Sequence, residues 1–499
     1  MIGRRILPRR ILTLAAAVSL TACHVGPNYR APPLPEGADA SLASLNRAIE
    51  TPTPPPDAWW KLYNDPRLDE LVQEALRANR DLAAAAANLA AARAITSEVH
   101  AARYPSTGVV AGGLYGRDPT TDEILELTGR PPQTLWIFED IFQAAYEVDL
   151  FGRVHRAIEA ANANTEAVAA TRDSVRVVVA AETTRAYAAI CALGEQLDVA
   201  HHSFAVVSRE AEITRQRFAA GAGSPYDVDR AQAIVAQVRA SIPQLEGERR
   251  AALFELTALL GRTPVEAPKG LEACGAPPHL ASLIPVGDGR SLIRRRPDVR
   301  QAERRLAVAT AEIGVATADL YPTIHLSGFF GGVATQVSLL NTNIGQAWGV
   351  GPSISWTFPN QAGPRARVRQ AKAAQVAALA SFDSVVLNAL KETEQALTLY
   401  GAALANRQAL GDARDKIRRA FEIARDGFAA GSLSTLDLLT TEQSLVALDA
   451  AVAAEDATLI QDQVAIFKAL GGGWQLEDTH CAAREPPTPS SLPAVRCRP

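Results

Sequence analysis

The 499-residue sequence contains few cysteines, a single methionine and no long apolar run. Five cysteines are too few for a disulfide framework in a chain of this length. The apolar stretches stay short of the roughly 18 consecutive residues that a membrane-spanning helix requires, which argues against a helical membrane protein. Because apolar residues make up 47% and charged residues 21% of the chain, a largely disordered protein is excluded as well.

Sequence motifs of catalysis are also missing. We find no P-loop, no glycine fingerprint for dinucleotides, no HExxH and no nucleophile elbow, so we expect no enzyme, no cofactor and no metal site. Residues 1–22 hold four arginines and no acid, and the remainder has 46 basic against 54 acidic residues, a net charge of −8. This acidic balance argues against nucleic acid as a partner.

The first 22 residues predict an export signal. Four arginines precede a short apolar run, which is the charged-then-apolar order of a signal peptide. The run ends at Leu20-Thr21-Ala22-Cys23, which resembles the bacterial lipobox. We therefore expect Cys23 to be lipidated and to become the new N-terminus, stably anchored by more than one acyl chain. An ordinary signal peptide with an incidental cysteine is the alternative. Residue 24 is His and not the Asp of inner-membrane lipoproteins, so the resemblance implies the outer membrane.

The body of the sequence contains two similar halves. At an offset of 210 residues, Phe218-Ala219-Ala220-Gly221 aligns with Phe428-Ala429-Ala430-Gly431. At an offset of 217 residues, Tyr104-Pro105 aligns with Tyr321-Pro322. Two copies of about 200 residues indicate a duplicated half-structure and not a solenoid, whose repeats are far shorter. We place the two repeats at residues 79–264 and 296–474.

Each repeat is expected to form a helix, two strands, a long helix, a turn and a further helix. Proline is absent between Gly152 and Pro225, and again between Pro364 and Pro486. Within these stretches apolar residues recur at steps of seven, four and three, the spacing of a coiled-coil seam. We expect long helices within 152–260 and 365–470. A continuous helix over residues 153–218 would be about 99 Å long, too long for a compact domain.

Four segments between the helical blocks are candidate transmembrane strands: about 104–116, 135–149, 321–333 and 346–358. Each has about the length of a tilted membrane-crossing strand and is flanked by aromatic residues, as at a membrane interface. Taken singly, such segments are more often soluble hairpins. Four strands cannot close a barrel, and an open edge in lipid is forbidden, so the chain must associate. A trimer would supply twelve strands.

Several motifs match a known family. They include Val25-Gly26-Pro27-Asn28-Tyr29 after the lipobox, Glu147–Arg153 at a strand-to-helix junction, and Leu292–Arg300 with its Arg-Arg-Arg-Pro-Asp sequence. The chain resembles the TolC-like outer-membrane factors, and among them the NodT-like lipoprotein branch of resistance-nodulation-division (RND) efflux systems. The match runs from about residue 20 to residue 474.

The resemblance implies a mainly α fold with a small transmembrane β part. Three copies would form a 12-stranded β-barrel in the outer membrane that continues into a periplasmic α-helical coiled-coil barrel. Residues 23–78 would form the lipid-anchored N-terminal segment and part of an equatorial belt, 265–295 would form a further equatorial segment, and 475–499 would be a Pro-rich tail. The implied partners are two further copies of the chain, a periplasmic adaptor protein, an inner-membrane RND transporter and outer-membrane lipid.

The paired turns after the long helices are the candidate functional site. Gly221 and Gly431 suit the positive φ of a helix C-cap. Ser224 and Ser434 are good N-caps, and each has an acid three residues later, Asp227 and Asp437, as in a capping box. Capping alone is therefore one interpretation of these acids.

By resemblance, the same turns form the periplasmic tip, where the pore closes and the adaptor docks. Each aspartate would become a ring of three carboxylates, which binds cations at a constriction. Some relatives lock the closed state with a Tyr and an Arg; here Phe428 and Leu433 stand at the matching positions. Thr440 replaces a second acidic ring. We therefore expect closure to rest on apolar packing and on the Asp437 ring.

Other conspicuous residues receive structural interpretations. The arginines from Arg290 to Arg305 are expected to form ion pairs at the start of a helix. Cys481 and Cys497 are candidates for a disulfide in the oxidising periplasm, with Cys274 as a competitor. Cys191, inside a long helix, is expected to be buried and inert.

The predicted function is a passive exit duct of a tripartite efflux pump, because the chain has no machinery to supply energy. It would conduct drugs or other small molecules received from an inner-membrane transporter and its adaptor. Alternatives are a duct for type I protein secretion or metal-ion efflux, or a non-transport periplasmic lipoprotein. The sequence does not name the cargo.

Overall fold

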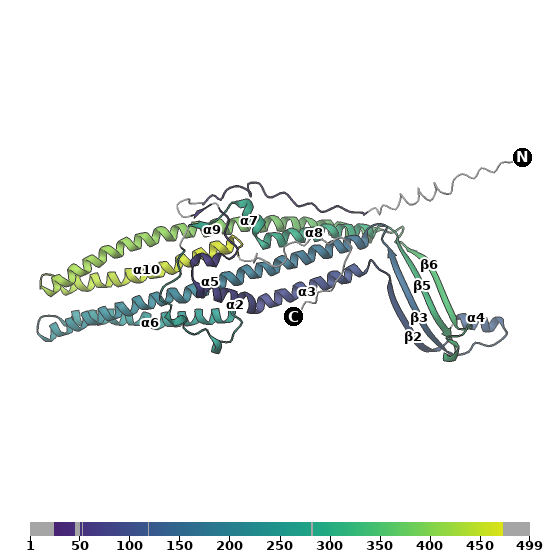
Figure 1. Ribbon diagram of the computed structural model, residues 1–499, viewed down its shortest axis with the longest axis horizontal. Helices are drawn as coiled ribbons and strands as arrows, with labels where there is room; N and C mark the ends of the chain where they lie inside the picture. The colour runs from purple at the N-terminus through teal and green to yellow at the C-terminus, as the bar shows by residue number, and fades with distance from the viewer. Residues whose placement is uncertain (1–23, 45–49, 52, 118, 281–282, 473–499) are drawn as a thin grey trace, which may run out of the picture. The chain divides into compact units, whose positions relative to one another are not determined.

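A computed structural model describes residues 24–44, 50–51, 53–117, 119–280 and 283–472, which are mainly helical (Figure 1). The predicted signal peptide, Cys23, and the tail with Cys481 and Cys497 lie outside the described residues. The chain divides into two compact units. The strand unit comprises Ala84–Arg172, Pro297–Asn388 and the described residues up to Glu36. The helical unit comprises Gly37–Ala83, Asp173–Arg296 and the described residues from Ala389 onward.

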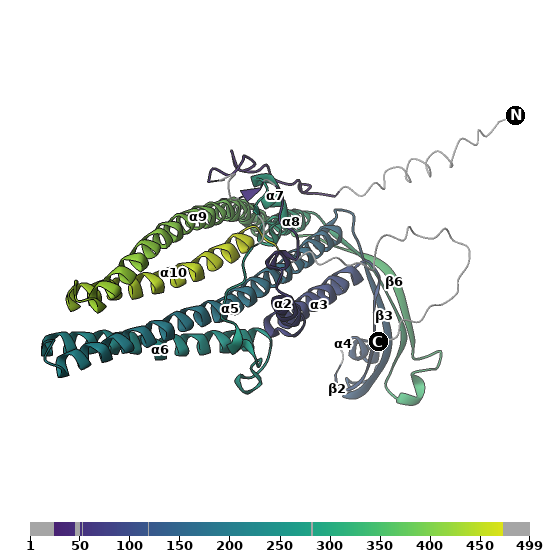
Figure 2. The ribbon, with the colours of Figure 1, turned by 60° about the vertical axis from the view of Figure 1, so that its left-hand side comes forward.

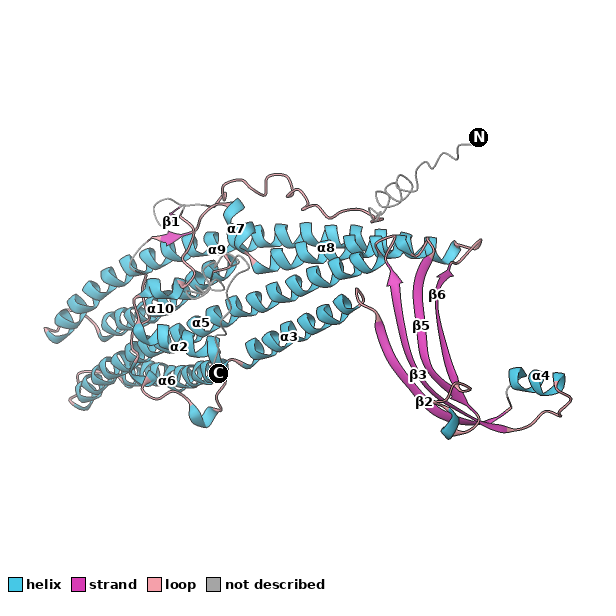
Figure 3. Ribbon diagram, turned by 45° about the vertical axis from the view of Figure 1, so that its right-hand side comes forward, coloured by secondary structure: helices cyan, strands magenta, loops and turns pink. Residues whose placement is uncertain are grey.

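The strand unit contains one four-stranded antiparallel sheet (Figure 3). Its strands are β2 (Ser106–Gly116), β3 (Leu135–Val148), β5 (Thr323–Ala334) and β6 (Gln346–Ser355). They pair in the order β2-β3-β5-β6, so each repeat supplies one hairpin and the two hairpins join through β3 and β5. The four predicted strands, two per repeat, are confirmed.

The sheet has two open edges, since β2 and β6 each pair on one side only within the described chain. Large apolar side chains on it are exposed. On β6, Trp348, Val350 and Ile354 alternate along the strand and so share one face, where each is about 70% exposed. Exposed apolar faces and unpaired edges are unstable in water, so lipid or another copy of the chain must cover them.

One element between the strands was missed by the sequence analysis. The short helix α4 (Pro119–Leu127) lies between β2 and β3. Its signal was present in the sequence, since Pro119 stands at the first position and Asp122 in the first turn, as is usual at a helix start. The helix is short and lies inside a hairpin loop, so helical periodicity alone does not reveal it.

Helices α3 (Arg80–Ala101) and α8 (Pro297–Ala318) precede the two strand hairpins. A two-residue parallel pair joins β1 (Glu50–Thr51) to β4 (Ile284–Pro285) in the helical unit. The same unit holds the single-turn helices η1 (Trp59–Tyr63), η2 (Pro264–Glu266) and η3 (Leu271–Ala273), while η4 (Val337–Leu339) lies between β5 and β6. The helices α2 (Pro66–Ala78) and α7 (Gly289–Arg295) complete the helical unit's shorter elements.

The N-terminal segment is fixed against helices of the strand unit. The buried Arg156 donates hydrogen bonds to the carbonyls of Val25 (3.2 Å) and Gly26 (3.3 Å), and to Asn28 Oδ1 (2.7 Å). A Cβ on Gly26, whose φ is +89°, would lie 2.5 Å from the Cα of Gly314. Gly26 and Gly314, which are far apart in the sequence, thus permit one close backbone contact.

Two long helical hairpins begin in the strand unit and run through the helical unit (Figures 1 and 2). Helix α5 (Arg153–Ala219) has 67 residues and α9 (Ala362–Ala429) has 68, so each is about 100 Å long. They turn back as α6 (Pro225–Leu259) and α10 (Thr435–Ala469), which have 35 residues each. The long, proline-poor stretches therefore form helices as predicted.

The core of the helical unit gathers apolar residues from the long helices around η1 and α2. Trp59 and Trp60 are fully buried, and the Trp59 ring stacks on Phe467 of α10 at 4.6 Å between centroids. A Cβ on Gly472 would meet the Trp59 ring at 2.8 Å. The glycines that end α10 thus let the chain pass close to this core.

Helices α5 and α9 each contain an 18-residue window apolar enough, by length and composition, to cross a membrane. The window in α5 has a mean hydropathy of 1.3 and is 72% buried, as expected of a core helix. The window in α9 has a mean hydropathy of 1.4 but is only 17% buried. The apolar window of α9 is therefore largely exposed on a single copy of the chain.

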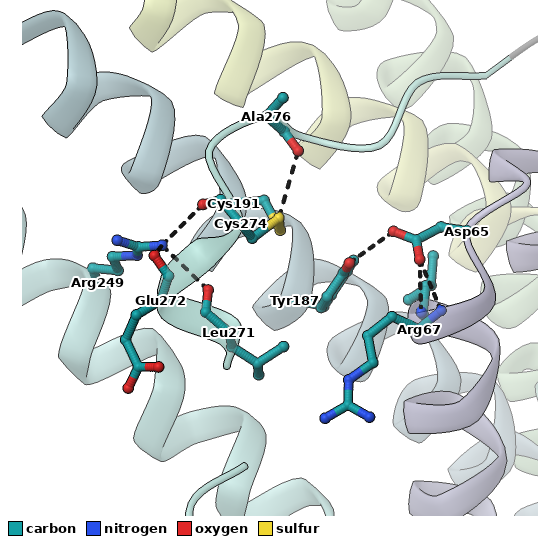
Figure 4. Close-up of a disulfide and its surroundings, with 10 residues drawn as sticks. Asp65, Arg67, Tyr187, Cys191, Arg249, Leu271, Glu272, Cys274 and Ala276 are labelled. Carbon is teal, nitrogen blue, oxygen red and sulfur yellow. Dashed lines mark hydrogen bonds between the residues drawn. A yellow bond between two sulfur atoms is a disulfide. The ribbon is translucent and has the colours of Figure 1, made fainter. Parts of the chain in front are cut away.

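A disulfide joins Cys191 of α5 to Cys274, which follows η3 (Figure 4). The expectation that Cys191 is inert is therefore wrong. The two cysteines are 83 residues apart in sequence, and only the folding of the loop after α6 against α5 brings them together. Gly194, one turn beyond Cys191, permits this approach, since a Cβ there would lie 2.1 Å from the Cys274 carbonyl oxygen.

The same loop is held from α6 by Arg249 (Figure 4). Its Nη2 donates hydrogen bonds to the carbonyls of Leu271 (3.2 Å), Glu272 (2.7 Å) and Cys274 (2.9 Å). One guanidinium thus satisfies three carbonyls of a segment that has little regular structure of its own. The disulfide and this arginine together fix the loop to both helices of the first long hairpin.

Candidate functional site

The two turns at the far ends of the long hairpins, residues 217–227 and 427–437, are built alike, and we call them the tip turns. Gly221 has a φ of +80° and Gly431 a φ of +76°. The N–H of Gly221 donates to Phe218 and that of Ala222 to Arg217, the bond pair of a Schellman cap. The second turn repeats this with Gly431 to Phe428 and Ser432 to Gly427.

Both following helices begin with a capping box. The Ser224 hydroxyl accepts from the N–H of Asp227 at 3.2 Å, and the Ser224 N–H donates to Asp227 Oδ2 at 3.3 Å. Ser434 and Asp437 form the same pair of bonds, both at 3.2 Å. The capping geometry expected from the sequence is therefore present at both turns.

The two aspartates differ in exposure, since Asp437 is exposed and Asp227 half-buried. Hydrogen bonds from the hydroxyl and the backbone N–H of Ser434 lower the pKa of the Asp437 carboxyl below its usual range. Asp437 is therefore ionised at any pH near neutrality. The same carboxylate caps the start of α10 and presents a negative charge to solvent.

The apolar residues of the second turn lie at different depths. Phe428 is 3% exposed and packs in a cluster with Phe421, Ala424 and Leu438. Leu433 is 38% exposed and covers Gly427, where an added Cβ would lie 2.8 Å from Leu433 Cδ1. Phe428 therefore belongs to the hairpin core, and Leu433 presents part of its surface at the tip.

Arg217 is a site residue that the sequence analysis missed. Its guanidinium carbon lies 3.7 Å from the ring centroid of Phe428, a cation–π contact, and its Nη2 donates to the Phe428 carbonyl at 2.8 Å. The two tip turns of one chain are thus joined by a polar contact, in addition to the apolar packing and the Asp437 ring on which we expect pore closure to rest. A basic residue in the last turn of a helix was the available signal.

A hydrogen bond also joins α6 to α10, the second helices of the two long hairpins. Arg230 of α6 donates to the Thr440 hydroxyl of α10 at 3.2 Å. Thr440, at the position where an acidic ring is absent, therefore accepts a bond from the neighbouring hairpin. Its own hydroxyl donates to the Leu436 carbonyl.

The arginine-rich segment forms the ion pairs that its sequence predicts. Arg296 Nη2 lies 2.8 Å from Glu392, and its Nη1 donates to the Ala469 carbonyl near the end of α10. Further ion pairs join Arg290 to Asp39, Arg295 to Asp57, and Arg304 to both Glu166 and Glu303. These ion pairs tie segments far apart in the sequence together.

Within the part of the chain that the structure describes, no group of three or more His, Cys, Asp or Glu side chains is arranged to hold a metal ion. The adjacent His201 and His202 are both exposed.

Comparisons with known proteins match the chain almost throughout. The family described as outer membrane efflux protein matches residues 71–262 and 290–472, which correspond to the two repeats. Cys274 lies in the unmatched segment between them. The solved structure of the outer-membrane channel OprN is 36% identical, with a TM-score of 0.85 over 91% of this chain and 100% of that one.

Two curated relatives have similar lengths. The probable outer membrane lipoprotein SilC of Salmonella typhimurium is 26% identical and covers 93% of this chain and 99% of its own length. Nodulation protein T of Rhizobium leguminosarum bv. viciae is 29% identical over 92% of this chain and 93% of its own.

Proposed function

Since the chain belongs to the outer membrane efflux protein family, we propose that three copies of it form the exit duct of a tripartite efflux pump. The protein is an outer-membrane efflux channel. Its strands cross the outer membrane, and its long helices extend into the periplasm.

The observation that carries the trimer is the four-stranded sheet with two open edges and an exposed apolar face. Four strands are too few to enclose a pore, whereas the smallest barrels in membranes have eight. Three copies would supply twelve strands and pair the β2 edge of each copy with the β6 edge of the next. The exposed apolar window of α9 favours contact between copies as well.

The tip turns are the proposed gate of this duct. Three-fold repetition makes Asp437 a ring of three exposed carboxylates, which would bind cations at the constriction. Leu433, Gly431 and Ser434 form the surface beside the Asp437 ring. Gly221 and Ser224 occupy the equivalent positions in the first tip turn. The Arg217–Phe428 contact ties the two turns of each copy together in the closed state. Asp227 is half-buried and therefore presents less of its carboxylate to solvent than the exposed Asp437.

The proposed partners are a periplasmic adaptor that docks at the tip turns and an inner-membrane RND transporter that supplies the energy. The cargo class is small molecules, including drugs, selected by that transporter. Lipidation at Cys23 would add an acyl anchor to the barrel. A purely structural periplasmic lipoprotein is disfavoured, because its strands would expose large apolar side chains to water.

The test is to reconstitute the purified full-length protein into liposomes and planar bilayers. A trimer that needs detergent for extraction and conducts ions supports the duct. A Cys23→Ala variant that is released as a water-soluble monomer and never conducts would contradict it, because the strands would then not be membrane-spanning.

A further inference from the structure

Two acidic side chains lie in the apolar interior of the bundle above the tip turns. Glu210 of α5 is 6% exposed and Glu442 of α10 is 1% exposed. Each stands in the middle of its helix's buried stripe: Val206, Val207 and Ile213 flank Glu210, and Leu438, Leu439, Leu445 and Val446 flank Glu442. An ionised carboxylate at such a position is costly unless it is paired.

Neither carboxyl has a compensating ion pair among the described residues. Glu442 Oε1 is buried and has no hydrogen-bond partner there. Burial, followed by the negative charge of Glu210, raises the pKa of Glu442 to about 7. Burial also raises the pKa of Glu210, against the opposing charges of Arg209 and Arg425. The negative charge of Glu210 therefore disfavours ionisation of the more deeply buried Glu442.

The other charged groups around the pair have partners or lie in solvent. Both glutamates line one cavity of about 730 Å³ between α5, α9 and α10. Arg418 pairs with Asp449, Arg425 with Asp426, and Arg217 with the Phe428 carbonyl. The remaining charged or titratable groups are the exposed His202, Arg209 and Glu422, and on α6 Arg230, which is bonded to Thr440.

We propose that Glu210 and Glu442 form a proton-binding switch of the gate, which holds the tip hairpins packed while protonated and loosens them when it loses its proton. The inference rests on the proposed function. The proton passes to water in the adjoining cavity, and the charge left behind favours separation of α5 from α10. The pair breaks the internal repeat, because the equivalent positions hold Ala420 and Gln232. One pair per copy would make three in a trimer.

The direction of the pH effect follows from linkage. The packed hairpins bind more protons than the separated ones, because packing raises the carboxyl pKa from an ordinary value near 4.5 to about 7. Opening therefore becomes easier as pH rises through that interval. Over this interval, the equilibrium constant for opening is expected to increase about ten- to a hundred-fold per copy.

The experiment records spontaneous openings of the full-length channel in planar bilayers between about pH 5 and pH 8 at constant ionic strength. Openings of the unmodified channel are expected to increase with pH. Glu442→Gln should give rare openings at every pH, and Glu442→Leu, which replaces the carboxyl by an apolar group, should do the same. Glu210→Gln should shift the midpoint to lower pH, since it removes the repulsion between the two carboxyls.

Two controls isolate the pair. Glu422→Gln removes an exposed carboxyl from the same cavity and should leave the pH profile unchanged. His202→Gln removes an exposed titratable group from the same cavity and should leave the pH profile unchanged as well. Openings that do not vary with pH, or a Glu442→Gln channel with the original profile, would overturn the inference alone. A chain that never conducts would contradict the proposed function too.

Discussion

The guanidinium of Arg217 lies over the ring of Phe428 at 3.7 Å and donates a hydrogen bond to the carbonyl of the same residue. One side chain near the end of α5 thus contacts both the side chain and the backbone of the residue that precedes the α9 cap. Because the two residues stand at the ends of different long helices, separation of the hairpins must break both contacts.

Replacement of Arg217 by Ala is therefore expected to favour the open tip. A cation–π contact and a hydrogen bond to a charged group together contribute about 1–3 kcal/mol, so spontaneous openings should rise roughly 5- to 100-fold in single-channel recordings. Arg215→Ala is the matched control, since Arg215 is exposed and pairs only locally with Glu212. Equal opening rates in the two variants would show that the Arg217 contact does not hold the gate.

Asp437→Asn should weaken cation block of the channel. The amide keeps an oxygen that can accept the capping bond from the backbone, while three negative charges leave the pore. Block by a trivalent cation added from the periplasmic side should weaken roughly tenfold, as measured by its half-blocking concentration. Asp227→Asn, at the half-buried equivalent, should have a smaller effect. The account of the ring is contradicted if Asp437→Asn is blocked as strongly as the unmodified channel.

The disulfide between Cys191 and Cys274 should stabilise the helical unit. It closes a long loop, and removing such a bond costs roughly 2–4 kcal/mol of unfolding free energy. Cys191→Ser with Cys274→Ser should therefore melt at a lower temperature than the original protein. Cys481→Ser with Cys497→Ser is the comparison pair. If the tail variant loses as much stability as the first one, the assignment of the bond is wrong.

Gly26→Ala should release the N-terminal segment from the strand unit. The new Cβ would meet the Gly314 backbone at 2.5 Å, in addition to the strain of a positive φ. Gly37→Ala carries the strain alone, because its φ is +79° and no atom lies within 4 Å of its added Cβ. Limited proteolysis should cut before residue 37 at least several-fold faster in the first variant than in the second. Identical cleavage rates would show that the contact with Gly314 does not fix the segment.

Much of this fold is encoded locally and could be predicted. The tip turns follow from Gly221, Ser224 and Asp227, whose preferred conformations do not depend on the rest of the chain. The strands and long helices follow from residue spacing and from the absence of proline. The repeat then required the second half to match the first.

The missed features depend on which helix faces meet in three dimensions. The Arg217–Phe428 contact joins residues 211 positions apart, and the Cys191–Cys274 bond joins residues 83 apart. Glu210 and Glu442 occupy positions that spacing alone assigns to apolar residues. Sequence periodicity identifies the buried stripe of a helix, but it does not say which side chain of the partner helix lies opposite.

The central claim is that the open edges of the sheet pair between copies into a closed ring. It is tested by placing one cysteine on β2 and one on β6 of the same chain and oxidising the protein in outer membranes, with the unmodified chain as control. The account predicts disulfide-linked products of two and three copies, and none larger, when the oxidised protein is separated by size without reducing agent. Linked products larger than three copies, or a protein that stays monomeric for every β2–β6 combination along the two strands, would contradict it.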